Sequence, residues 1–219
     1  MLKTTKIEAG EIHIWKVDIP ECLSEKQELF SYLPEQEAYR ASRYRFEKDY
    51  NKYVITRGLL RSLLGQYLNE KPHKITIEYN FNGKPFVNNY EGLNFNLSHT
   101  EDFSLIAFTV NQEIGIDVEL TRNDINFDGI VEASFTKDEI SRIMQISTAK
   151  KVELFYKIWT RKEALIKAKG ISLARVIDGS EATDPFDETD WFITSFKAKK
   201  LYQAALASNK NSVKIRFCN

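Results

Sequence analysis

Apolar and polar residues alternate along several short segments of the chain, which is the pattern of half-buried β-strands. Between these segments the apolar residues recur at helical spacing. The strand patterns cover Glu11–Val17, Ile75–Tyr79, Phe95–Leu97, Leu105–Val110, Ile114–Leu120, Phe192–Ala198, Ala204–Ala207 and Val213–Phe217, and the helical patterns cover Ser24–Leu33, Glu35–Leu68, Thr136–Ile146 and Lys151–Lys169. The patterns together predict an α+β fold.

The order of these elements is similar in the two halves of the chain. Each half, 1–111 and 112–219, offers one dominant helix and about three strands. We therefore expect two similar α+β halves in one chain, arranged as a pseudo-dimer. In each half a long helix would pack on a small, mainly antiparallel sheet. Because both halves lie in one chain, we expect a monomer.

Composition narrows the class of protein. The chain has 219 residues, of which 42% are hydrophobic and 28% charged, as in a globular protein with a sizeable core. Two cysteines are too few for a disulfide scaffold, and three histidines lack the spacing of a zinc site. Neither a signal-peptide pattern nor a run of 18 apolar residues is present, so we expect a cytoplasmic protein with no membrane partner.

Charge is balanced overall but not locally. With 31 basic and 31 acidic residues the net charge is zero, which disfavours a nucleic-acid binder. Residues 40–61 and 150–169 each contain seven basic and two acidic residues, whereas residues 178–190 contain six acids and no Lys or Arg. Solvated helix faces and an acidic loop would explain these runs. The alternative is a site for one small polyanion.

Two carboxylates alternate along the strand pattern Ile114–Leu120. A strand places Asp117 and Glu119 on one face and Ile116 and Val118 on the other. Paired carboxylates suit a hard divalent cation such as Mg²⁺. An amphipathic edge strand with its acids in water has the same pattern, so the segment alone leaves both interpretations open.

A second candidate lies on the helical pattern 151–169. Trp159, Glu163 and Lys167 are spaced four residues apart and share one helix face. Glu163 and Lys167 could form an ordinary surface pair. They could instead complete a cation site, provide a base and bind phosphate, and the segment does not decide between these.

Two short loops add phosphate-binding candidates. Gly83-Lys84-Pro85 follows the turn signal Asn82-Gly83, and Ser98-His99 ends a predicted strand. A glycine loop followed by Lys can approach a phosphate, and Ser98 and His99 can donate hydrogen bonds to it. A plain hairpin turn and a strand cap are the structural alternatives. A serine hydrolase is disfavoured because G-x-S-x-G is absent.

The order of these motifs resembles a known family. A basic helix, G-K-P, N-x-S-H, G-I-D-V-E and W-x-x-K-E-x-x-x-K followed by Gly170 occur in this order between about Arg40 and Leu173. The order is similar to that of the 4′-phosphopantetheinyl transferases, specifically the long, monomeric surfactin-synthetase-activating type. The first 35 and last 45 residues match that type only in strand pattern.

The resemblance implies a reaction. The family transfers the 4′-phosphopantetheine arm of coenzyme A to a serine of an apo acyl or peptidyl carrier protein, with Mg²⁺, and releases adenosine 3′,5′-bisphosphate. Such carriers serve fatty-acid, polyketide or nonribosomal peptide synthesis, and the sequence does not identify which carrier this chain would use.

The resemblance also implies roles for individual residues. Asp117, Glu119 and Glu163 would hold Mg²⁺, Glu163 would accept the serine proton, and Lys162 and Lys167 would bind phosphate. The loop Gly83, Lys84 and Pro85, together with Ser98 and His99, would contact the nucleotide, and Arg40 and Lys52 its 3′-phosphate. Glu139 matches an acidic position near the active site. Lys52 stands where Arg is usual, and Tyr39 and Ser42 stand at positions that are usually basic.

Two other classes of function use similar residues. A metal-dependent nuclease or other phosphodiesterase also places acids on a strand, but such sites usually have a Lys where Thr121 stands. A noncatalytic regulator that binds coenzyme A or a carrier protein would not need three carboxylates beside a polyanion. The sequence therefore favours the transferase.

Overall fold

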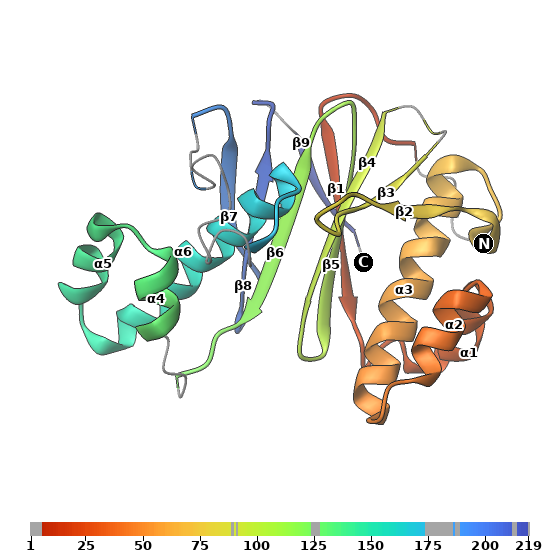
Figure 1. The fold of residues 1–219 in the computed structure, drawn as a ribbon, viewed down its shortest axis with the longest axis horizontal. Helices are drawn as coiled ribbons and strands as arrows, with labels where there is room; N and C mark the ends of the chain where they lie inside the picture. The colour runs from red at the N-terminus through yellow and green to blue at the C-terminus, as the bar shows by residue number, and fades with distance from the viewer. Residues whose placement is uncertain are drawn as a thin grey trace.

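The structure is a computed structural model that describes residues 6–88, 90, 92–123, 128–173, 186, 189–211 and 214–218 (Figure 1). Its elements up to the middle of the chain are β1 (Glu11–Asp18), η1 (Leu23–Glu25), α1 (Lys26–Ser31), α2 (Glu35–Ser42), α3 (Glu47–Leu68), η2 (Pro72–Lys74), β2 (Ile77–Tyr79), β3 (Pro85–Val87), β4 (Leu93–Thr100) and β5 (Phe103–Val110). The remaining elements are β6 (Ile114–Leu120), α4 (Asp128–Ser134), α5 (Lys137–Met144), α6 (Thr148–Lys169), β7 (Phe192–Lys199), β8 (Tyr202–Ser208) and β9 (Lys214–Cys218).

The predicted α+β class is confirmed, but the helices differ from the prediction at two places. The patterns did not predict α4, at Asp128–Ser134. The helix predicted over 35–68 is two helices, because α2 ends at Ser42 and α3 begins at Glu47. Phe46 has an extended backbone, and Glu47 and Asp49 lie in the first turn of α3, where acidic side chains favour a helix start. Apolar spacing alone did not reveal this break.

The strands form small, mainly antiparallel sheets, as expected. One sheet has the order β4-β5-β1-β9, a second has the order β6-β8-β7, and β2 pairs with β3 in a hairpin. The only parallel pairing among the described strands joins β1 to β9. The last strand of the chain therefore belongs to the same sheet as strands from the first half.

The two sheets face each other, and a long helix covers the outer face of each (Figure 1). The core between α3 and its sheet includes Ile55, Leu60, Leu64, Phe95 and Phe108. The core between the sheets includes Ile12, Ile14, Leu105, Ile116, Val118 and Leu206. The core between α6 and its sheet includes Ala164, Leu165, Ala168, Ala205 and Ala207. Within the described residues no helix is long and apolar enough to cross a membrane.

Helix α6 lies directly on the backbone of β6. A side-chain carbon at Gly115 would stand 2.1 Å from the carbonyl oxygen of Ala164 and 2.3 Å from the amide nitrogen of Ala168. Only glycine allows this approach, because a real Cβ does not come within 3.0 Å of such atoms. Since alternate residues of a strand share a face, Asp117 and Glu119 also turn toward α6.

Candidate active site

Strands β4 and β6 are joined by side chains where the two sheets meet. Residues 96, 98 and 100 share one face of β4, and each bonds to β6. The contacts are Asn96 Oδ1 accepting from the Ile116 amide at 2.9 Å, Ser98 Oγ donating to Asp117 Oδ1 at 2.8 Å, and Thr100 Oγ1 donating to Glu119 Oε2 at 3.2 Å. The strand pattern therefore predicted correctly that Asp117 and Glu119 share a face, with Ile116 and Val118 in the core.

Lys167 reaches this face from α6. Its Nζ lies 2.6 Å from Asp117 Oδ1 and donates to Ser98 Oγ at 2.9 Å. Burial alone would lower the pKa of Lys167, but the charges of Asp117 and Glu163 outweigh it and raise that pKa. Among the described residues, Asp117 Oδ2 is buried without a hydrogen-bond partner. This oxygen is available to a further cation.

Glu119 and Glu163 share their environment with Asp117. Burial, followed by the negative charge of Asp117, raises the pKa of Glu119 to about 7. Burial likewise raises the pKa of Glu163 to about 7, with Asp117 adding to the shift and Lys167 opposing it. Through these charge effects the three carboxylates and the Lys167 ammonium form one electrostatic cluster.

The donor types of the cluster can be compared with those of a magnesium site. No three Asp, Glu, His or Cys residues of the described chain already converge as metal ligands. Asp117 Oδ1 is paired with the Lys167 ammonium at 2.6 Å. Carboxylate oxygens are the donors that Mg²⁺ prefers, and a buried Asp117 oxygen lacks a partner. The residues therefore fit this ion in donor type and in charge.

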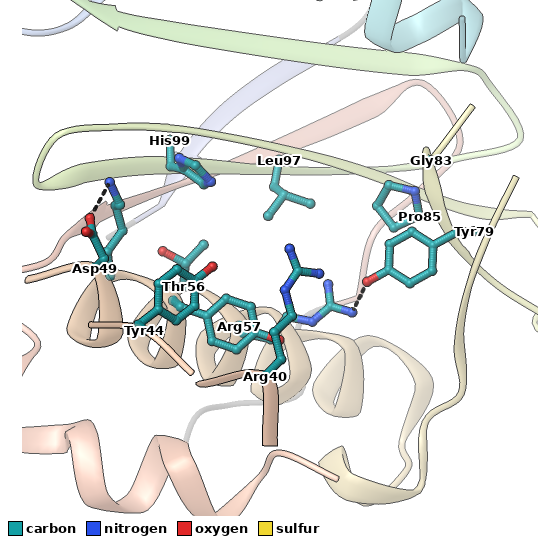
Figure 2. A pocket seen from close by; sticks show the side chains of 12 residues that line it. Arg40, Tyr44, Asp49, Thr56, Arg57, Tyr79, Gly83, Pro85, Leu97 and His99 are labelled. Atoms are coloured by element: carbon teal, nitrogen blue, oxygen red, sulfur yellow. Dashed lines mark hydrogen bonds and ion pairs between the residues drawn. The ribbon is translucent and has the colours of Figure 1, made fainter. Parts of the chain in front are cut away.

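A cavity of about 400 Å³ lies on the opposite face of β4 (Figure 2). Figure 2 shows His99 and Leu97 on the strand side and Thr56, Arg57 and Arg40 on the helical side. The lining residues are Arg40, Tyr44, Asp49, Lys52, Tyr53, Thr56, Arg57, Tyr79, Gly83, Pro85, Leu97 and His99. Five residues predicted to bind the nucleotide, namely Arg40, Lys52, Gly83, Pro85 and His99, thus line one cavity.

Strand geometry links this cavity to the carboxylate cluster. Successive residues of β4 point to opposite faces, so Ser98 bonds to Asp117 while His99 lines the cavity. Desolvation and the positive charges of Lys52 and Lys167 lower the pKa of His99. The imidazole is therefore neutral at pH 7 in the absence of an anion. Ser98, expected at the nucleotide, lies instead on the carboxylate side.

A buried ion-pair network supports one wall of the cavity. Arg57 and Arg61 donate to the Glu37 carboxylate at 2.8 Å and 2.6 Å through their Nε atoms, and Arg57 also donates to the Tyr79 hydroxyl at 2.7 Å. Sequence reasoning missed Arg57, Tyr79 and the rings of Tyr44 and Tyr53. The charge run contained Arg57, but only tertiary packing shows which of its cations face the cavity.

Two predicted binding residues, Lys84 and Lys162, lie outside this arrangement, and Glu139 lies beside Lys162. Lys84 Nζ donates to the Ala168 carbonyl at 2.7 Å and to Glu113 at 2.9 Å, so it turns to the end of α6. Lys162 is buried, pairs with Glu139 at 3.1 Å and lies over the Phe186 ring. Lys162 therefore turns to α5, whereas Lys167 turns to β6.

Comparison with known proteins identifies the family of this chain. A family model described as 4′-phosphopantetheinyl transferase, N-terminal, matches residues 21–111. A second, described as 4′-phosphopantetheinyl transferase superfamily, matches residues 113–218. The chain belongs to the 4′-phosphopantetheinyl transferase superfamily and is a transferase of its long, two-part type.

Individual relatives span most of the chain. The 4′-phosphopantetheinyl transferase HetI of Nostoc sp. (strain PCC 7120) is 32% identical over 180 residues, which cover 81% of this chain and 76% of the relative. The transferase psf-1 of Bacillus pumilus is 26% identical over 91% of this chain and 88% of its own. The transferase Sfp of Bacillus subtilis (strain 168) is 26% identical over 74% and 71%.

Proposed function

We propose that this protein transfers the 4′-phosphopantetheine group of coenzyme A to a serine of an apo acyl or peptidyl carrier protein, with Mg²⁺, and releases adenosine 3′,5′-bisphosphate. One observation carries the proposal. The cavity and the carboxylate cluster lie on opposite faces of one strand, β4, through His99 and Ser98. A ligand with a nucleotide at one end and a pyrophosphate in its middle suits two such adjoining sites.

The cavity has the groups that the nucleotide end requires. Arg40 and Lys52 would supply positive charge for the 3′-phosphate, and the ring N–H of neutral His99 can donate a hydrogen bond to a phosphate oxygen. Arg40 lies over the Tyr53 ring, with its guanidinium carbon 5.5 Å from the ring centre, so this cation is held in place. The tyrosine rings also offer aromatic surface to a purine.

The carboxylate cluster suits the reacting end. Asp117, Glu119 and Glu163 would hold Mg²⁺, which would supply positive charge against the negative charge of the leaving group. The Lys167 ammonium bonds to Asp117 and Ser98. When coenzyme A binds, this ammonium would give up part of this bonding and donate to phosphate oxygens. Mg²⁺ and the Lys167 ammonium would thus both counter the negative charge of the pyrophosphate.

We propose Glu163 as the base. A carrier serine is a weak nucleophile at neutral pH, and the Glu163 carboxylate would accept its proton, directly or through a water. The serine oxygen then bonds to the pantetheine-bearing phosphorus. The bond from that phosphorus to the bridging pyrophosphate oxygen breaks, and its electron pair leaves with adenosine 3′,5′-bisphosphate.

The proposal includes the organisation of the chain. Residues 1–111 contribute every residue that lines the cavity, and residues 112–219 contribute the three carboxylates and Lys167. We propose that these two halves act as a pseudo-dimer within a monomer. An acidic carrier would complement the basic residues around this junction.

Intact mass spectrometry of apo carrier proteins tests this function. The purified protein, coenzyme A and Mg²⁺ should increase the mass of at least one fatty-acid, polyketide or peptide-synthesis carrier by one phosphopantetheine group. Replacing the carrier serine with alanine should abolish the increase. An unchanged mass across all three classes of carrier would contradict the proposal.

A further inference from the structure

Helix α6, which carries Glu163 and Lys167, ends in a glycine cap. Gly170 has a φ of +66°, in the left-handed region that glycine adopts most readily. The amide of Gly170 donates to the Lys167 carbonyl at 3.3 Å, and the amide of Ile171 to the Ile166 carbonyl at 3.2 Å. These bonds leave the carbonyls of Ala168 and Gly170 to be satisfied from outside the helix.

The loop between β2 and β3 supplies those donors. Lys84 Nζ donates to the Ala168 carbonyl at 2.7 Å. The Gly170 carbonyl accepts from Asn80 Nδ2 at 3.1 Å and from Asn82 Nδ2 at 3.0 Å. Figure 1 shows this loop, which is far from α6 in sequence, reaching across to the end of that helix. A positive charge at this end of a helix is also favoured by the helix dipole.

The loop is held rigidly enough to act as a clamp. The side-chain oxygen of Asn80 accepts from the amides of Asn82 and Lys84, each at 2.9 Å. The amide of Gly83 donates to the Asn80 carbonyl at 3.0 Å, and Gly83 has a φ of +86° that favours glycine. The Asn80 side chain thus ties the loop together with its oxygen and holds α6 with its nitrogen.

The same loop also reaches the cavity. Gly83 and Pro85 line it, while Lys84, between them, turns to α6. We propose that Lys84, with Asn80 and Asn82, is a positioning residue that clamps the end of α6 and so sets Glu163 and Lys167 relative to the bound nucleotide. The consequence for catalysis rests on the proposed function, whereas the clamp itself does not.

Hydrogen exchange tests the clamp without any substrate. The variant Lys84→Met keeps the length of the side chain but removes its charge and donors. Peptides covering residues 166–173 should exchange roughly fivefold faster in this variant than in the wild type, as expected for the loss of one capping contact. The Lys84→Arg variant should retain slow exchange in these peptides. If Lys84→Met does not fold, Asn82→Ala provides the test and should raise the exchange rate of the same peptides.

Two controls separate the clamp from general loosening. Lys200→Met removes an exposed lysine in the turn between β7 and β8, and Glu113→Ala removes the other partner of Lys84. Both should exchange like the wild type in residues 166–173. Unchanged exchange in Lys84→Met and Asn82→Ala would overturn the clamp, whether or not the protein is a transferase.

Transfer kinetics test the positioning role. Because Lys84 holds α6, Lys84→Met should lower kcat severalfold while the KM for coenzyme A stays near the wild-type value. Lys84→Arg should restore kcat. A raised KM with an unchanged kcat would assign Lys84 to direct nucleotide binding and overturn the positioning role. Absence of transfer by the wild type would contradict the proposed function alone, because the exchange experiment stands independently.

Discussion

Gly115 sets the distance between the strand and the helix that carry the carboxylate cluster. In Gly115→Ala the new Cβ would lie 2.1 Å from the Ala164 carbonyl oxygen, whereas real Cβ contacts stay beyond 3.0 Å. Strand β6 and helix α6 must therefore separate by roughly 1 Å, a displacement of the size that can cost about 100-fold in rate when it misplaces catalytic groups. The overpacking itself should cost about 1–3 kcal/mol of unfolding free energy.

Gly129→Ala is the matched control for this change. Gly129 lies in α4, and a Cβ there would have no atom within 4 Å. Alanine is also the better helix former, so this control should be neutral or stabilising by up to about 1 kcal/mol. Urea unfolding and the rate of phosphopantetheine transfer should be measured for both variants. Equal unfolding midpoints and equal rates for Gly115→Ala and the wild type would refute the reasoning.

Two further predictions concern buried polar groups. In Glu37→Gln, Arg57 and Arg61 lose their carboxylate, which should cost about 3 kcal/mol at pH 7 by urea unfolding. Burial opposes ionisation of Glu37, but the two guanidinium groups outweigh it and lower the pKa of this carboxyl below its unfolded value. The stability difference between the variant and the wild type should therefore be largest above about pH 5 and shrink as the pH falls through the folded pKa of Glu37. A difference that grows in acid would contradict this. In Ser98→Ala, Asp117 loses a hydrogen bond inside the protein, which should lower the unfolding free energy by about 1–3 kcal/mol, and an unchanged urea midpoint would show that the bond is unimportant.

The sequence predicted the local parts of this molecule well. Alternation along Ile114–Leu120 placed Asp117 and Glu119 on one face, because strand periodicity is a property of the backbone alone. Helical spacing likewise predicted most of α6. The sequence did not predict the three-residue strand β3 or the break between α2 and α3. Both depend on tertiary contacts.

Side-chain direction was the part that the sequence could not provide. Lys84 was expected at the nucleotide and Lys162 at phosphate, yet Lys84 bonds to the end of α6 and Lys162 pairs with Glu139. A lysine side chain is long and flexible, so its partner is determined by whichever acceptor the fold brings near. The pairing of β9 with β1 is equally nonlocal, because nothing in either strand specifies the other.

The central claim is that Glu163, in the carboxylate cluster beside the nucleotide cavity, is needed to transfer the phosphopantetheine arm. Intact mass spectrometry of one responsive apo carrier, incubated with coenzyme A, Mg²⁺ and either the wild type or Glu163→Gln, tests this most directly. The account predicts one added phosphopantetheine group with the wild type and none with the variant, although both proteins unfold cooperatively. Transfer by Glu163→Gln at the wild-type rate would contradict it.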